Sequence, residues 1–201
     1  MSLSRSQVVG AAVDLVRRYG LADLTMRRLA RELGVAPGAI YWHVESKQHL
    51  VVQVAEVLLC EIGDPSPDLP PAETVAWLAS ALREAVAGVP DGPDVVGVAC
   101  AVDPASIHLL RELSRAVGRL LPGQGERDAV VDLVVHHVLG SVAAEQNRRN
   151  AGVLVTCRTD AVDAAEPARA ASAAGAVKSF ETGLAVIVAG LVARPVPGCT
   201  Q

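Results

Sequence analysis

Residues 25–47 read TMRRLARELGVAPGAIYWHVESK, and this stretch decides the fold of the N-terminal part of the chain. Thr25 is a good helix N-cap because its hydroxyl can accept a hydrogen bond from a backbone N–H of the first turn. Gly34 stands where a helix ends in left-handed backbone, and Pro37 is tolerated in the first turn of the next helix. Helix, glycine turn and helix form the helix-turn-helix layout, whose second helix enters the major groove of DNA. The spacing therefore predicts a DNA-binding motif.

Charge is distributed unevenly along the 201 residues. The formal net charge is −4, yet residues 1–50 hold seven Lys/Arg against four Asp/Glu. The N-terminal segment therefore carries +3 and the remainder −7. A basic head on an acidic body indicates a surface for phosphates at the N-terminus and a different task for the rest of the chain.

Apolar residues recur with helical periodicity through most of the chain. The expected helices cover residues 4–20, the two halves of 25–47, 46–63, 72–89, 94–101, 104–121, 126–149 and 177–193. Asp103 and Pro104 are expected to be the N-cap and first residue of the helix over 104–121. The alanine-rich residues 158–176 suit either a mobile loop or a weak helix. Since no stretch alternates as a strand does, the predicted class is all-α.

Four widely spaced cysteines form no C-x-x-C pair, which argues against a zinc or redox motif. They are Cys60, Cys100, Cys157 and Cys199. The simplest interpretation is buried free thiols in a cytosolic protein. No apolar signal core stands at the N-terminus, and the apolar stretches read as shorter than the ~20 residues that span a bilayer. We expect a cytoplasmic protein with no membrane partner.

The head resembles the TetR family of bacterial transcriptional repressors. The residues that carry the resemblance are 24–30, 33–35, 40–44 and Lys47. Two segments of the body, 138–146 and 180–191, are similar to the tetracycline-repressor subgroup of that family. The resemblance implies a three-helix helix-turn-helix DNA-binding domain over 1–46, followed by a helical-bundle ligand-binding and dimerisation domain over 47–201. It also implies a homodimer formed through the helices at about 126–149 and 177–193.

Eight residues of the head are candidates for DNA binding. Phosphate contacts are expected from Thr25, Tyr41, His43 and Lys47, since phosphates are met by cations, hydroxyls and helix N-termini. By resemblance Arg27 is the main base reader, because an Arg fork can bind guanine through two hydrogen bonds. Ala36, Gly38 and Ala39 offer only small contacts, for instance to thymine methyl groups. We expect Arg28 and Arg31 to be solvated surface charges and Trp42 to plug the core between the helices at 4–20 and 46–63.

The body offers polar side chains within apolar helices, where a largely apolar ligand pocket needs a few convergent polar groups. The candidate ligand-binding residues are Trp77, Cys100, His108, His137 and Asn147. The other interpretation of His137 is a hydrogen-bonded residue of the core or of an interface. No cofactor and no metal site is expected.

The sequence therefore favours a ligand-responsive transcriptional regulator. The specific hypothesis is a repressor that leaves a palindromic operator when a small-molecule inducer shifts the helix that carries the head. The alternative is a DNA-binding regulator or architectural protein without a small-molecule ligand. A metal-dependent hydrolase using His136, His137 and Glu145 is disfavoured, because adjacent histidines on a helix project about 100° apart and chelate one metal poorly. No catalytic residue is expected, and the protein is predicted not to be an enzyme.

Overall fold

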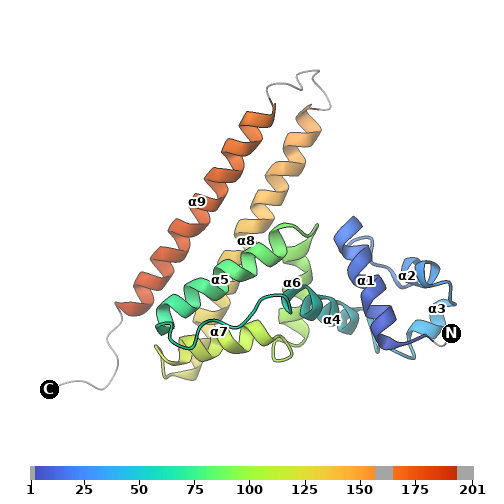
Figure 1. Ribbon diagram of the computed structural model, residues 1–201, viewed down its shortest axis with the longest axis horizontal. Coiled ribbons are helices and arrows are strands. Elements are labelled where there is room, and N and C mark those ends of the chain that lie inside the picture. Colours follow the sequence, from blue (N-terminus) through green and yellow to red (C-terminus); the bar gives the residue numbers. More distant parts are fainter. Residues whose placement is uncertain (1–2, 157–164, 194–201) are drawn as a thin grey trace. The chain divides into compact units, whose positions relative to one another are not determined.

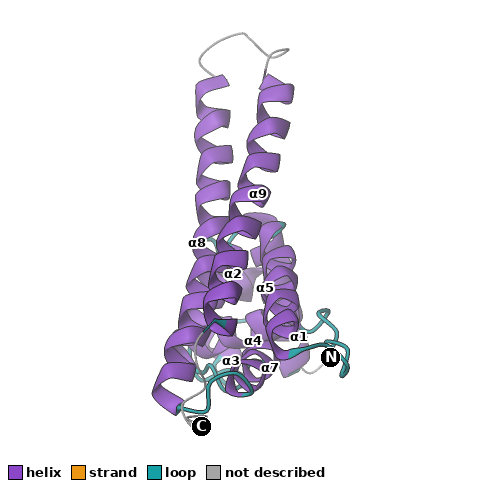
Figure 2. Ribbon diagram, turned by 90° about the vertical axis from the view of Figure 1, so that its left-hand side faces the viewer, coloured by secondary structure: helices purple, strands orange, loops and turns teal. Residues whose placement is uncertain are grey.

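The computed structural model describes residues 3–156 and 165–193, with side chains given outside 152–173. This part of the chain is built from nine helices and contains no strand (Figure 1; Figure 2), which confirms the all-α prediction. The helices are α1 Arg5–Tyr19, α2 Met26–Leu33, α3 Pro37–Ile40, α4 Lys47–Leu59, α5 Pro71–Ala87, α6 Gly92–Val102, α7 His108–Gly118, α8 Gln124–Thr156 and α9 Ala165–Val192.

Several helix boundaries differ from the sequence prediction, among them the end of α4, which lies at Leu59 rather than at residue 63. The helix predicted to begin at Pro104 begins instead at His108 as α7. Asp103 does not cap it, because the Asp103 carboxylate accepts the Ser106 N–H at 3.2 Å and closes a turn before the helix. α8 continues past residue 149 to Thr156, and α9 starts at Ala165 rather than near 177. From Ala165 onward the alanine-rich segment therefore takes the helical alternative.

The chain divides into two compact units. The first unit comprises Met1–Asp64 and Ala81–Glu112, and the second comprises Pro65–Ser80 and Leu113–Gln201. The unit boundary falls inside α5 and α7, so each of these helices contributes a part to each unit.

Aliphatic side chains build the core of the first unit, where α1 packs on α2 and α4, α2 on α3, and α4 on α6. The buried face of α1 presents residues three to four positions apart, as its apolar periodicity predicts. Among the fully buried side chains of this unit are Val8, Val16, Leu24, Leu29, Ile40, Leu50, Val51 and Val54. The helix-turn-helix stretch is thereby anchored to the first helix and, through α4, to α6.

In the second unit α8 and α9 run antiparallel and lie side by side in both ribbon views (Figure 1; Figure 2). His137 on α8 hydrogen-bonds through Nε2 to the Phe180 carbonyl at 3.0 Å, and its ring stacks on the Phe180 ring with centroids 5.3 Å apart. Gly183 admits the imidazole, since an added Cβ would overlap His137 Cε1 and lie 2.9 Å from Nε2. The prediction that His137 is a hydrogen-bonded residue between packed helices matches this geometry.

One helical segment contradicts the expectation that every apolar stretch is much shorter than a membrane span. Ala174–Val192 is 19 residues long and apolar enough, by length and composition alone, to cross a membrane. Only 22% of this segment is buried within the chain, so most of its apolar surface is uncovered. A core helix of a water-soluble monomer would be mostly buried, and this one therefore needs another explanation for its apolar side chains.

The cysteines also differ in part from expectation. Cys60 is exposed at the end of α4, where its thiol donates to the Val57 carbonyl at 3.0 Å, and Cys100 on α6 is half-buried. The prediction of a buried thiol is therefore wrong for Cys60. Cys157 and Cys199 lie outside the described residues.

Candidate nucleic-acid interface

The start of α2 is fixed by Thr25, as the sequence predicts. Its backbone is extended and its hydroxyl accepts the Arg28 N–H at 3.1 Å, which satisfies one of the unpaired donors of the first turn. The side chain is exposed, and the helix N-terminus carries the positive end of the macrodipole. The exposed cap and the positive end of the dipole are features that favour a phosphate at this end of α2, and the contact itself stays a prediction.

Gly34 closes α2 in left-handed backbone, with φ 66° and ψ 30°. Its N–H reaches the Ala30 and Arg31 carbonyls, and the Val35 N–H returns to the Ala30 carbonyl at 3.0 Å. This is a Schellman-type ending, which glycine adopts without the steric cost that a Cβ would add. The turn sends the chain from α2 into α3.

α3 has only four helical residues, and the chain continues in turns before α4. Ile40 and Val44 are buried and hold this segment to the head, while the Val44 N–H donates to the Ile40 carbonyl at 3.1 Å. Trp42 lies between these two anchors and is 89% exposed, so the prediction that it plugs the core is wrong. The physical reason is periodicity: residues four apart share the inward face, and the residue midway between them points away.

The predicted DNA-binding residues come from α2 and α3 with their N-cap residues Thr25 and Ala36, from the turn after α3 and from the first residue of α4. Thr25, Arg27, Ala36, Gly38 and Tyr41 are exposed, whereas Ala39, His43 and Lys47 are half-buried. α4 begins at Lys47 behind the predicted cap Ser46, whose hydroxyl accepts the His49 N–H at 3.1 Å. Because α2 packs on α3, the donors on α2 and the small residues on α3 belong to one folded segment.

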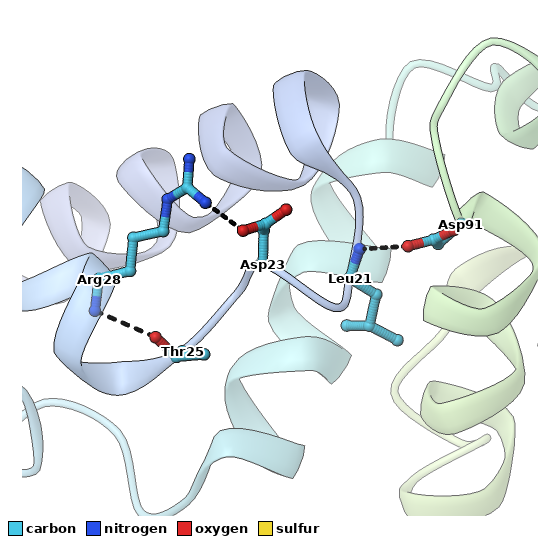
Figure 3. Close-up of polar contacts among 5 residues, drawn as sticks. All are labelled: Leu21, Asp23, Thr25, Arg28 and Asp91. Atoms are coloured by element: carbon cyan, nitrogen blue, oxygen red, sulfur yellow. Dashed lines mark hydrogen bonds and ion pairs between the residues drawn. The ribbon is translucent and has the colours of Figure 1, made fainter.

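Arg27 and Arg28 are adjacent in sequence and differ in environment. Arg27 is exposed and, within the described part of the chain, has no hydrogen-bond or ion-pair partner. Arg28 forms an ion pair with Asp23 (Figure 3). Its guanidinium carbon lies 4.1 Å from the centre of the Tyr19 ring. The expectation that Arg28 is a solvated charge is therefore wrong, whereas Arg27 is available to a groove.

A residue of the turn between α5 and α6, Asp91, also forms a hydrogen bond with the connection between α1 and α2. The Leu21 N–H donates to the Asp91 carboxylate at 3.0 Å (Figure 3). Gly20, with φ 83°, lets Asp91 approach, because a Cβ there would overlap the carboxylate. Asp91 itself has φ 54°, a left-handed conformation that Asp tolerates better than most residues.

Sequence reasoning did not find Tyr19, Asp23 or Asp91. Tyr19 fits the apolar stripe of α1 by spacing, although half of its surface is exposed. Asp91-Gly92 is a turn signal whose partner lies 70 residues away. Nothing in the local sequence identifies a contact at that separation.

The five candidate ligand-binding residues are divided between the units. Trp77, His137 and Asn147 belong to the second unit, and Cys100 and His108 to the first. His108 is exposed and pairs through Nε2 with Asp64 at 2.7 Å. His137 contacts Phe180 of α9 through its hydrogen bond and its stacked ring, and Asn147 is exposed. Their shared role in binding a ligand stays a prediction.

The residues considered for a metal-dependent hydrolase do not form a metal site in the described ranges. His136 is exposed, His137 uses Nε2 on a backbone carbonyl, and the buried Glu145 carboxylate pairs with Arg149. Across the described ranges no three His, Cys, Asp or Glu side chains converge so that they could hold a metal ion.

Known proteins resemble the chain over its head and over nearly its whole length. A family model described as bacterial regulatory proteins, tetR family, matches residues 8–54. The tetracycline repressor protein class A from transposon 1721 of Escherichia coli is 31% identical over 212 residues, covering 96% of this chain and 92% of that protein.

Solved structures agree with these sequence matches. The crystal structure of Mycobacterium smegmatis BioQ superposes with a TM-score of 0.77 at 32% identity, covering 96% of this chain and all of that one. A BioQ structure with its double-stranded DNA operator superposes with a TM-score of 0.76 at 31% identity, covering 96% and 99% of the two chains. Streptomyces coelicolor ActR in complex with (S)-DNPA has a TM-score of 0.73 at 22% identity, covering 96% and 98%, a likeness of fold.

Proposed function

Because the chain belongs to the TetR family of bacterial regulatory proteins, we propose that it is a dimeric repressor that a small molecule releases from a palindromic operator. Residues 1–46 are the DNA-binding domain of this proposal, and residues 47–201 are the ligand-binding and dimerisation domain. The relatives are transcriptional regulators and repressors. We accordingly assign the protein to the cytoplasm and assign it no catalytic residue.

The observation that carries the DNA-binding part is the exposed N-terminal turn of α2. Thr25 caps this turn, and Arg27 extends from it without an internal partner among the described residues. The surrounding segment is basic, so it attracts phosphates, while Arg27 can distinguish guanine in the groove. The small residues of α3 leave Arg27 with most of the direct readout.

Dimerisation explains the apolar surface that α8 and α9 leave uncovered. Leu133 is 51% exposed and Val186 is 68% exposed, and both lie on long helices with few buried positions. A second copy of the chain, packing the same two helices against these side chains, would remove them from water as an isologous interface. The Ala174–Val192 segment is then apolar because it is an interface helix.

The dimer has a direct test. Val186→Glu should shift sedimentation toward the monomer, because it puts a charge into the apolar contact. Lys178→Gln, at an exposed position of the same helix, makes the same −1 change in charge and should remain dimeric. A Val186→Glu protein that stays fully dimeric would contradict this interface.

The ligand response is proposed to pass through α6 and α4. α4 packs on both α6 and α1, so a displacement of α6 changes the support of the DNA-binding helices. A ligand would release DNA only if it binds the two states unequally. A compound that raises the melting temperature and also lowers operator affinity supports this proposal. Tight binding with unchanged DNA affinity contradicts it.

DNA recognition can be tested with duplexes enriched by the wild-type protein from a random-sequence pool. In a mobility-shift titration Arg27→Ala should weaken binding to the enriched duplex by about 1–3 kcal/mol, the value of a bidentate base contact. Arg31→Ala removes the same charge from the same helix and should change the affinity much less. Equal losses in the two variants would refute Arg27 as the base reader.

The alternative is a DNA-binding protein without a small-molecule ligand. Both hypotheses expect the same DNA-binding head. The alternative differs in the body, where no compound would stabilise the protein in a thermal-shift screen. Continued failure of a broad screen alongside specific DNA binding would favour this alternative.

A further inference from the structure

We propose that Arg28 is a positioning residue that clamps the α1–α2 connection and thereby orients the N-terminus of α2 toward DNA. The inference rests on the proposed DNA-binding function and deepens it, because it divides two adjacent arginines into one that reads DNA and one that does not. Its basis is a contact that joins three consecutive pieces of the chain: the last turn of α1, the connection and the first turn of α2.

The guanidinium of Arg28 has two internal partners. One is the Asp23 carboxylate in the connection, and the other is the face of Tyr19 at the end of α1, 4.1 Å from the ring centre. The Arg28 side chain is 31% exposed, so it lies along the protein rather than extending from it. Stacking on an aromatic face together with a carboxylate pair suits the planar, delocalised guanidinium better than a lysine ammonium.

The backbone of the same residue completes the arrangement. The Arg28 N–H donates to Thr25 Oγ1, and the Thr25 N–H donates to the Asp23 carbonyl at 2.9 Å. Asp23, Thr25 and Arg28 therefore form a closed set of contacts around the first turn of α2 (Figure 3). The exit of α1 and the entry of α2 are fixed relative to one another, and with them the backbone from which the exposed Arg27 side chain extends.

Asp23 supplies the argument against a direct phosphate role for Arg28. A cation meant for DNA gains from having no carboxylate beside it, since the carboxylate competes for the guanidinium and repels phosphate. Arg27 has no such competitor in the described ranges, whereas Arg28 does. Removal of the Asp23 charge should therefore lower the affinity for DNA if Arg28 is a positioning residue and raise it if Arg28 contacts phosphate.

The deciding experiment measures binding of the whole protein to the enriched duplex and to a random duplex between 50 and 200 mM salt, a range of about fourfold in ionic strength. As a positioning pair, Asp23→Asn and Arg28→Ala should each weaken binding to the enriched duplex roughly fivefold to tenfold, the size of one ordinary lost interaction. Binding of Asp23→Asn to the random duplex should not weaken. If Arg28 instead contacts phosphate, Asp23→Asn should bind more tightly. Arg28→Ala should then reduce the salt slope, which is the steepness with which log K falls against log salt concentration, by about 0.9 for each phosphate contact, or about 1.8 per dimer.

Two further variants separate positioning from simple loss of structure. The double variant Asp23→Asn/Arg28→Ala restores the net charge of the head, and it should bind no more weakly than either single variant because both remove the same contact. Arg28→Lys should recover affinity only in part, whereas at a phosphate contact it would recover nearly all of it. Glu32→Gln, an exposed acid on α2, is the charge-matched control for Asp23→Asn and should not weaken binding.

Each outcome decides the matter. Weaker specific binding with an unchanged salt slope supports the clamp, and tighter binding of Asp23→Asn or a reduced slope for Arg28→Ala overturns it. If Arg28→Ala unfolds in a denaturation control, Asp23→Asn and Arg28→Lys still carry the test. If the wild-type protein enriches no duplex at all, the proposed function itself fails, and that result is visible before any variant is made.

Discussion

Gly20→Ala is expected to destabilise the protein by about 3 kcal/mol, more than an ordinary glycine substitution. Gly20 has φ 83° and ψ 178°, a region that is essentially restricted to glycine and costs other residues about 1–3 kcal/mol. The new Cβ would also overlap Asp91 Oδ2 and lie 3.0 Å from Cγ, so the carboxylate must move. Moving it breaks the 3.0 Å hydrogen bond from Leu21, and a bond to a charged group contributes about 1.5–3 kcal/mol.

The expected value follows from these terms. About 2 kcal/mol of backbone strain and about 2 kcal/mol for the lost bond are offset by a gain of roughly 0.4–1 kcal/mol, because alanine restricts the unfolded chain. In an Asp91→Gly background the collision and the bond are both absent, and glycine accepts the left-handed backbone at position 91. There the same substitution should cost only about 1–1.5 kcal/mol.

Two other glycines serve as controls. Gly34 has φ 66° and open space where a Cβ would stand, so Gly34→Ala should cost about 1 kcal/mol, from backbone strain alone. Gly10 lies exposed inside α1 with nothing near the Cβ position, and Gly10→Ala should stabilise by about 0.5–1 kcal/mol.

The assay is equilibrium urea unfolding followed by circular dichroism at one fixed protein concentration, because dimerisation links stability to concentration. The reasoning would be refuted if Gly20→Ala cost no more than Gly34→Ala. It would also be refuted if the cost of Gly20→Ala were the same with and without the Asp91 side chain.

Three further outcomes are expected. Thr25→Ala should destabilise by about 1 kcal/mol in urea unfolding, because the Arg28 N–H loses its cap, while Thr25→Ser should be nearly neutral. Gly183→Ala should cost about 1–3 kcal/mol by overpacking against His137, and the loss should shrink in a His137→Ala background, which leaves room for the methyl group. Adding the enriched duplex should change the fluorescence of the exposed Trp42, and the change should disappear in Trp42→Phe; an identical change in Trp42→Phe would assign it to Trp77.

Local sequence determined much of the head. Caps, the left-handed glycine and the apolar spacing are interactions between residues within about four positions, so the residue types nearly dictate them. Thr25 and Ser46 cap their helices, and Gly34 ends α2 as its position in the sequence predicts. The same locality explains the success of the all-α prediction, because helical periodicity is read within a single segment.

Some local patterns were nevertheless compatible with two local structures. Trp42 is large and apolar, which favoured the core, but Ile40 and Val44 already fill the inward face. Asp103-Pro104 is a good helix start in isolation, yet the Asp103 carboxylate bonds Ser106 in a turn. In each case residues two or three positions away select one of the two local structures.

Only the tertiary structure decided the contacts that give the head its orientation. By sequence Arg28 was expected to be a solvated charge, and it is the proximity of Tyr19 and Asp23 that gives it internal partners. The bond from Leu21 to Asp91 crosses 70 residues, and the fit of His137 against Gly183 joins two helices. The sequence by itself therefore determined a helical head with a helix-turn-helix layout, since that layout depends on local spacing, whereas the role of Arg27 as base reader rests on the resemblance and stays a prediction. The tertiary structure decided how that head is held, because contacts between distant residues exist only once the helices have packed.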